Sequence, residues 1–195
     1  MIWNLPIDID AAHSAFAYKL GAAKYHFRQL ETLSHEHVPL IIEWTKNHQD
    51  PVPSPMMEIF YHLDAFIYQL YSCFDMILQI INIQHGLGVA ENKVSWGNED
   101  NKPFKKKLRL SSPAVYQLLD DAFQADWFVE LKRTRDHLAH RGFSALTVAY
   151  SEENETVLLM LPGLSLLLTE RCDMWGNRMA ELYKTLSSSS PLPHV

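Results

Sequence analysis

Apolar residues recur every three or four positions along the first part of the chain, which is the spacing of one face of an α-helix. The first such segment runs from Asp10 to about Leu33, with Asp8 or Asp10 available to cap its start. A longer segment opens at Ser54 and Pro55 and ends near the sequence HGLG. Its apolar positions are Met56, Ile59, Phe60, Leu63, Ile67, Leu70, Phe74, Ile77 and Ile81. The pattern therefore predicts two long helices, each with one buried face.

Two more main helices are predicted in the second half of the chain. Ser112 followed by Pro113 is typical of a helix start, and the helical pattern continues to His140, with a break near Asp126 and an end at Gly142. A last helix is predicted from about Ser165. Its apolar face would hold Leu168, Cys172, Trp175, Met179, Leu182 and Leu186.

Shorter elements fill two of the gaps. A short helix is predicted to begin at Pro39, whose fixed φ suits a first helical position. Apolar and polar residues alternate on both sides of the sequence SEENE, which predicts a β-hairpin near residues 145–161. We therefore expect an all-α fold: an antiparallel bundle of four main helices, with the short helix and the small hairpin added.

The length of 195 residues is most simply one domain, large enough to hide roughly 70% of its unfolded-state surface. We expect a single helical domain over 1–187, followed by a disordered serine-rich tail over 188–195. Cys73 and Cys172 lie far apart, on predicted buried faces, and are expected to be reduced core thiols. The apolar stretch VLLMLPGLSLLL is too short to span a bilayer, so a cytoplasmic protein that binds no membrane is expected.

Charge is distributed unevenly along the chain. The formal net charge is -6, yet residues 102–141 hold nine of the seventeen Lys and Arg against five acidic residues. Within the long connector 86–111, which lacks clear periodicity, the run KPFKKKLR is the most basic part. If the protein binds a polyanion such as RNA, this segment is where we expect the contact.

The sequence LKRTRDHLAHRG, residues 131–142, ends the third main helix. Helical geometry at 100° per residue places four residues toward the core: Trp127, Leu131, Thr134 and Leu138. Asp136 and His140 fall together on the opposite side, and Arg135 lies at the edge between the two. His140 is therefore predicted to face solvent or a second subunit.

These residue types suit one kind of chemistry. Asp136 can accept a hydrogen bond from the ring of His140 and so favour its protonated form, and a histidine that titrates near neutral pH can act as general acid or base. The planar guanidinium of Arg135 suits phosphate. A base with a phosphate clamp and no metal suits cleavage of RNA by its own 2′-hydroxyl. Arg-to-His pairs with similar spacing occur three times in the chain, so the charged end of a solvated helix is the simpler alternative.

The segment RDHLAH, from Arg135 to His140, resembles the Arg, polar residue, three others, His signature of the HEPN superfamily, which comprises small all-helical domains of prokaryotic RNases and toxins. The resemblance implies that Arg135 contacts the scissile phosphate, His140 is the general acid/base and Asp136 organises them. It also implies a homodimer in which two copies of the motif face each other without a metal or other cofactor. The products would carry a 2′,3′-cyclic phosphate and a 5′-hydroxyl.

One position departs from the family pattern. The residue after the arginine is commonly asparagine, whereas Asp136 adds a negative charge beside the place where a phosphate must bind. The leading prediction is a HEPN-type endoribonuclease, with a toxin or phage-defence role and a cognate antitoxin or regulatory protein as partner. The alternative is a non-catalytic HEPN-like module that binds RNA or a protein.

Other residues are predicted to bind the RNA or to support His140. The predicted RNA-binding residues are Lys105, Lys106, Lys107, Arg109, Arg133 and Arg141. Asp75, on the second main helix, is a candidate to support His140 without touching RNA. No two of the ten histidines are four residues apart and no Glu stands three before a histidine, so a helical metal site is not predicted.

Overall fold

The computed structural model describes residues 8–47, 54–97, 102–141, 147–153, 156–161 and 164–188, and these residues are mostly helical. In chain order the helices are α1 (Ile9–Glu36), α2 (Val38–Asn47), α3 (Ser54–Gln84), α4 (Pro103–Ser111), α5 (Pro113–Gln124), α6 (Asp126–Arg141) and α7 (Leu168–Ser188), with a 3-10 turn at Glu91–Lys93. The strands are β1 (Thr147–Ser151), β2 (Thr156–Leu161) and β3 (Leu164–Leu167).

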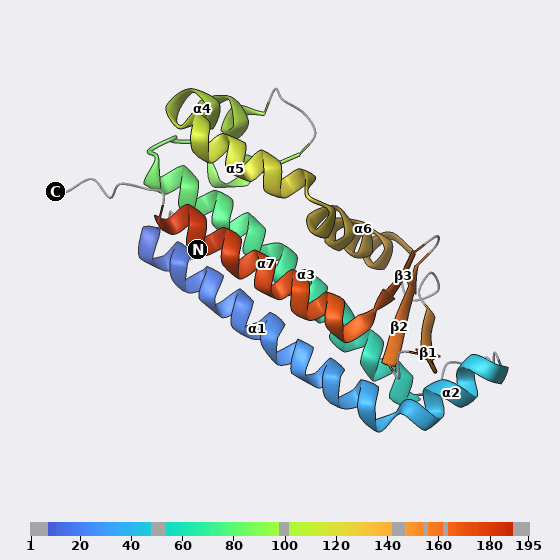
Figure 1. Cartoon of the computed structure of the whole chain (residues 1–195). Coiled ribbons are helices and arrows are strands. Elements are labelled where there is room, and N and C mark those ends of the chain that lie inside the picture. The colour runs from blue at the N-terminus through green and yellow to red at the C-terminus, as the bar shows by residue number, and fades with distance from the viewer. Residues whose placement is uncertain are drawn as a thin grey trace.

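The two longest helices, α1 and α3, run antiparallel and lie side by side over most of their length (Figure 1). Asp8 caps α1 by accepting a hydrogen bond from the backbone N–H of Ala11 at 2.7 Å, as predicted. Helix α7 returns alongside them, with the ring of Tyr183 stacked on that of Phe16 at 3.8 Å between centroids. The predicted short helix is α2, which continues from the end of α1.

The predicted apolar faces form the core. All nine apolar positions of α3 and all six of α7 are buried. Cys73 and Cys172 are buried and free, and burial raises the pKa of the Cys73 thiol to about 12. By length and composition Met56–Gln84 is apolar enough to cross a membrane, but most of its apolar window is buried inside the protein.

The predicted break in the third main helix is confirmed. Helix α5 ends at Gln124, Ala125 has the extended values φ -64 and ψ 142, and α6 begins at Asp126. The break turns the chain so that Phe128 packs on Phe74 of α3, with 4.6 Å between the ring centroids. Helix α6 is therefore fixed against α3, and its far end carries the RDHLAH sequence.

The prediction of a connector without regular structure over 86–111 is wrong for Pro103–Ser111, which form α4. Pro103 stands at the first turn of this helix, where its missing N–H is tolerated. Its buried side consists of Phe104, Lys105 and Leu108. One of the three buried positions is a lysine. The pattern of apolar residues along the sequence therefore does not show which side of this helix is buried.

The strand segment also differs from the prediction. β1 and β2 pair antiparallel, from Thr147 opposite Met160 to Ser151 opposite Thr156, where the alternation predicts a hairpin. A third strand, β3, pairs with β2 and takes up the residues around Ser165 that were predicted to open the last helix. Helix α7 therefore begins later, at Leu168, and continues to Ser188. The rest of the predicted tail lies outside the described residues.

Candidate functional site

The C-terminal half of α6 presents its predicted core face to the protein interior. Leu131 and Thr134 are fully buried and Leu138 nearly so, which confirms the prediction for these three residues. Trp127 is only half-buried and packs at the edge of the core. Thr134 tolerates its buried position because its hydroxyl donates to the backbone oxygen of Glu130 at 2.9 Å. Arg135, the next residue, consequently lies at the boundary between core and surface.

Arg135 is surrounded by groups that attract a cation. Its Nη2 atom lies 3.0 Å from Oδ1 of Asp136, and its Cζ atom lies 4.2 Å from the centroid of the Tyr71 ring on α3. The first contact is an ion pair and the second a cation–π interaction. Its Nε atom is buried and has no hydrogen-bond partner among the described residues. The arginine is thus held in place while about a third of its side chain remains exposed.

Asp75 and Tyr71, one turn apart on α3, complete what we call the Arg135 cluster: Tyr71, Asp75, Arg135 and Asp136. Burial raises the pKa of the Asp75 carboxyl, and the charge of Arg135 opposes this rise. Asp75 is nevertheless an exposed residue, so the rise in its pKa reflects the protein that surrounds one side of the carboxyl and not complete enclosure. Burial also raises the pKa of the Tyr71 phenol; Arg135 opposes this, while Asp75 and Asp136 add to it. The Arg135 guanidinium therefore pairs directly with Asp136, and its charge also favours the ionised form of Asp75.

The remaining predicted residues of this helix are placed only in part. His140 and Arg141 belong to the last turn of α6, and their side chains lie outside the described part of the structure. His140 is four residues beyond Asp136, so the backbone puts the two positions on one face of the helix. Arg133 is exposed on α6. The structure thus brings Asp75, Arg135 and Asp136 together, and it leaves the direction of His140 a prediction.

The predicted basic group on α4 is not a single exposed patch. Lys105 is only 4% exposed: its Nζ donates to the backbone oxygen of Gly97 at 3.0 Å and lies 4.0 Å from Oδ1 of Asp120. Lys107 is exposed but donates to the backbone oxygen of Leu87 at 2.6 Å. Lys106 is exposed. The expectation that Lys105 offers its charge on the outer surface is therefore corrected, because this lysine points into the protein.

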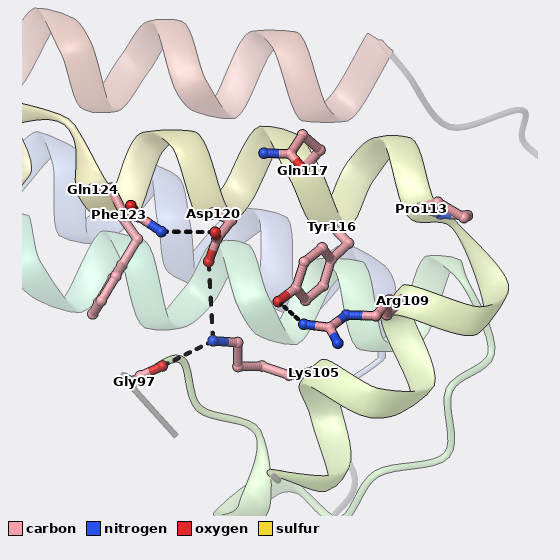
Figure 2. A pocket seen from close by; sticks show the side chains of 9 residues that line it. All are labelled: Gly97, Lys105, Arg109, Pro113, Tyr116, Gln117, Asp120, Phe123 and Gln124. Atoms are coloured by element: carbon pink, nitrogen blue, oxygen red, sulfur yellow. Dashed lines mark hydrogen bonds and ion pairs between the residues drawn. The ribbon is translucent and has the colours of Figure 1, made fainter. Parts of the chain in front are cut away.

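A cavity of about 690 Å³ opens beside Lys105, between α4 and α5 (Figure 2). Its lining consists of Gly97, Lys105, Arg109, Pro113, Tyr116, Gln117, Asp120, Phe123 and Gln124. Arg109 donates from Nη2 to the Tyr116 hydroxyl at 2.5 Å, with its guanidinium over the Tyr116 ring. Sequence reasoning missed this cavity. The available signal was the i, i+4 spacing of Lys105 with Arg109 and of Tyr116 with Asp120.

No family model, curated protein or solved structure matches this chain. The HEPN resemblance therefore depends on the residues from Arg135 to His140. Among the described residues, no three His, Cys, Asp or Glu side chains gather closely enough to hold a metal ion. A pair of histidines does meet between α1 and α3, where Nδ1 of His26 lies 2.9 Å from Nδ1 of His62. Burial and then the charge of His62 lower the pKa of His26.

Proposed function

We propose that this protein is a metal-independent endoribonuclease of the HEPN type that acts as a homodimer. The observation that supports the proposal best is the Arg135 cluster: an arginine held at the surface, one and a half turns before His140, between two carboxyl groups and an aromatic ring. The proposal includes the fold, in which α1, α3, α5 with α6, and α7 form the four main parts of an antiparallel HEPN-like bundle.

The proposed reaction uses the 2′-hydroxyl of RNA as nucleophile. His140 takes the proton of this hydroxyl, the oxygen attacks the adjacent phosphorus, and the bond from phosphorus to the 5′-oxygen breaks. A second copy of His140, facing the first across the dimer, gives a proton to the departing 5′-oxygen. Arg135 stabilises the charge that develops on the phosphate oxygens. The products are a 2′,3′-cyclic phosphate and a 5′-hydroxyl, and no metal enters the steps.

Asp136 has two opposed effects in this scheme. Its carboxylate fixes the guanidinium of Arg135 through the 3.0 Å ion pair, which orients the phosphate ligand. The same negative charge repels an incoming phosphate, by about 1 to 4 kcal/mol at 4 Å for dielectric constants between those of water and a protein surface. RNA must therefore compete with a carboxylate that is already in place, and we expect a slow or tightly regulated enzyme.

That ion pair also favours the second candidate, a non-catalytic HEPN-like module. A guanidinium neutralised by its own neighbour gains less by binding phosphate, so the same surface would serve RNA binding without cleavage, or a protein partner such as a cognate antitoxin or regulator. A toxin or phage-defence role in the cytoplasm, and the absence of membrane binding, belong to the proposal.

The test is RNA cleavage by purified protein in EDTA. Wild type, Arg135→Ala and His140→Ala are compared with the control Arg178→Ala, which removes an exposed arginine of α7 that pairs with Glu181. We expect His140→Ala to lower the cleavage rate by about 10²- to 10⁴-fold and the control to have no effect. Equal cleavage by all four proteins would overturn the assignment. RNA binding without product would select the non-catalytic module.

A further inference from the structure

We propose that the cavity between α4 and α5 binds a small phosphate monoester. This site is separate from the Arg135 cluster, because its lining comes from α4, α5 and Gly97, whereas the cluster lies on α3 and α6. Its volume of about 690 Å³ falls within the range of roughly 300–1,000 Å³ that small-molecule sites occupy. The chemistry of its two walls decides which ligand it suits.

The α4 wall supplies two cations. Lys105 and Arg109 are four residues apart and both line the cavity (Figure 2). A lysine that is 4% exposed is costly to bury unless paired, and Lys105 is held by Gly97 and Asp120, with its Nζ also 5.0 Å from the centroid of the Trp96 ring. Arg109 is exposed, and its guanidinium lies 4.6 Å above the centroid of the Tyr116 ring. Both cations are therefore fixed before any ligand arrives.

The charge balance favours a dianion. Asp120 is the one acid among the described lining residues, so the two cations leave a net charge of +1 in the lining. A phosphate monoester carries close to two negative charges at neutral pH, and guanidinium binds phosphate through paired N–H donors. A carboxylate carries only one negative charge and would therefore be attracted less strongly by the two cations.

The α5 wall selects the rest of the ligand. Tyr116 and Phe123 offer ring surfaces, and Asp120 offers a carboxylate. The amides of Gln117 and Gln124 each donate one N–H of Nε2 to a carboxylate, at 2.7 and 2.8 Å, and each keeps its second N–H and its Oε1 for a ligand. This wall therefore suits a flat group with polar edges, such as a ring with an amino substituent. Such a phosphate occurs either as a free metabolite or at the 5′ end of an RNA strand.

The test is direct titration of the folded protein with AMP, adenosine, acetate and two RNA oligonucleotides that differ only in a 5′-phosphate. We expect AMP to bind at least tenfold more tightly than adenosine, because the charge-assisted hydrogen bonds to the phosphate are lost in adenosine. Tighter binding of the 5′-phosphorylated RNA than of AMP identifies the RNA end as the source. Binding of AMP with no preference between the two RNAs identifies a free metabolite.

Arg109→Gln and the matched control Lys106→Gln make the test specific. Both remove one cation from α4, but Lys106 does not line the cavity. We expect about a tenfold or greater loss of AMP affinity in Arg109→Gln and little change in the control, with circular dichroism confirming that both fold. Three results would overturn the proposal: no binding of AMP or phosphorylated RNA at millimolar concentration, equal affinity of the Arg109 variant, or competition by acetate at the concentration at which AMP binds. RNA cleavage plays no part in this measurement. A failure of the phosphate-site proposal is therefore distinguishable from a failure of the proposed ribonuclease function.

Discussion

Arg135 and Asp136, neighbours in the sequence, form an ion pair with 3.0 Å between Nη2 and Oδ1. Adjacent residues of a helix point about 100° apart, so this contact requires both side chains to bend toward each other. The result is a guanidinium whose charge is already partly neutralised. In the proposed function, we expect this pair to set how strongly the site binds RNA.

Replacing Asp136 by Asn should raise activity. Asparagine keeps the acceptor oxygen and removes the negative charge, so we expect RNA binding and kcat/KM for cleavage to rise by about three- to tenfold, equivalent to roughly 0.7 to 1.4 kcal/mol. Steady-state cleavage of a short RNA in EDTA measures this change. A fall to the rate of His140→Ala would show instead that the carboxylate itself is needed.

Asp75 should reduce stability at neutral pH. Its pKa in the folded protein is raised above the ordinary value of 3.8, so folding disfavours the charged carboxylate. The resulting loss of stability is absent at pH values below 3.8. It grows as the pH rises through the raised pKa and is complete at neutral pH. We expect Asp75→Asn to increase the Tm at pH 7 and to change it less near pH 3.5. A Tm that falls at pH 7 would mean that the attraction to Arg135 outweighs burial.

The His26 and His62 pair should make the protein sensitive to mild acid. The pKa of His26 is lowered from 6.5 by burial and then by His62, so its contribution to stability is complete above pH 6.5 and is lost as pH falls through the lowered pKa. When the pH is lowered from about 7 to 5, we expect the Tm of His26→Gln to fall less than the Tm of the wild type. The control His35→Gln, at an exposed histidine of α1, should keep the wild-type slope. Parallel slopes for wild type and His26→Gln would contradict this account.

Lys105 should stabilise the fold as well as the cavity. Its removal leaves Asp120 and the Gly97 carbonyl without their cation and takes the side chain away from Trp96. We expect Lys105→Ala to lower the free energy of unfolding by about 2 kcal/mol, and Lys106→Ala to change it by less than about 0.5 kcal/mol. Urea unfolding of both variants checks the difference. Similar values would show that Lys105 is not a structural lysine.

Local patterns predicted much of the fold. The apolar period of α3, the cap at Asp8 and the break before Asp126 are properties of short stretches of sequence, and tertiary contacts reinforce them. The same geometry placed Thr134 inside and Arg135 at the boundary. Such predictions succeed where local preference and burial agree.

Other features depend on partners far along the chain. Strand β3 exists because β2 offers it hydrogen bonds, from Leu158 opposite Leu167 onward, and no local pattern shows this. The apolar pattern did not predict α4 because Lys105 occupies one of its buried positions. The burial of this lysine depends on Asp120 and Trp96. The cavity needs α4 beside α5, so it could not be predicted without α4. The contact between Arg135 and Tyr71 likewise needs the packing of α6 on α3.

The most direct test of the central claim is the chemistry of the RNA ends after incubation in EDTA. If Arg135 and His140 cleave RNA through its own 2′-hydroxyl, the fragments carry 2′,3′-cyclic phosphates and 5′-hydroxyls, and both end groups disappear in Arg135→Ala and His140→Ala. Fragments with 5′-phosphates, or cyclic-phosphate ends formed equally by the two variants, would contradict it.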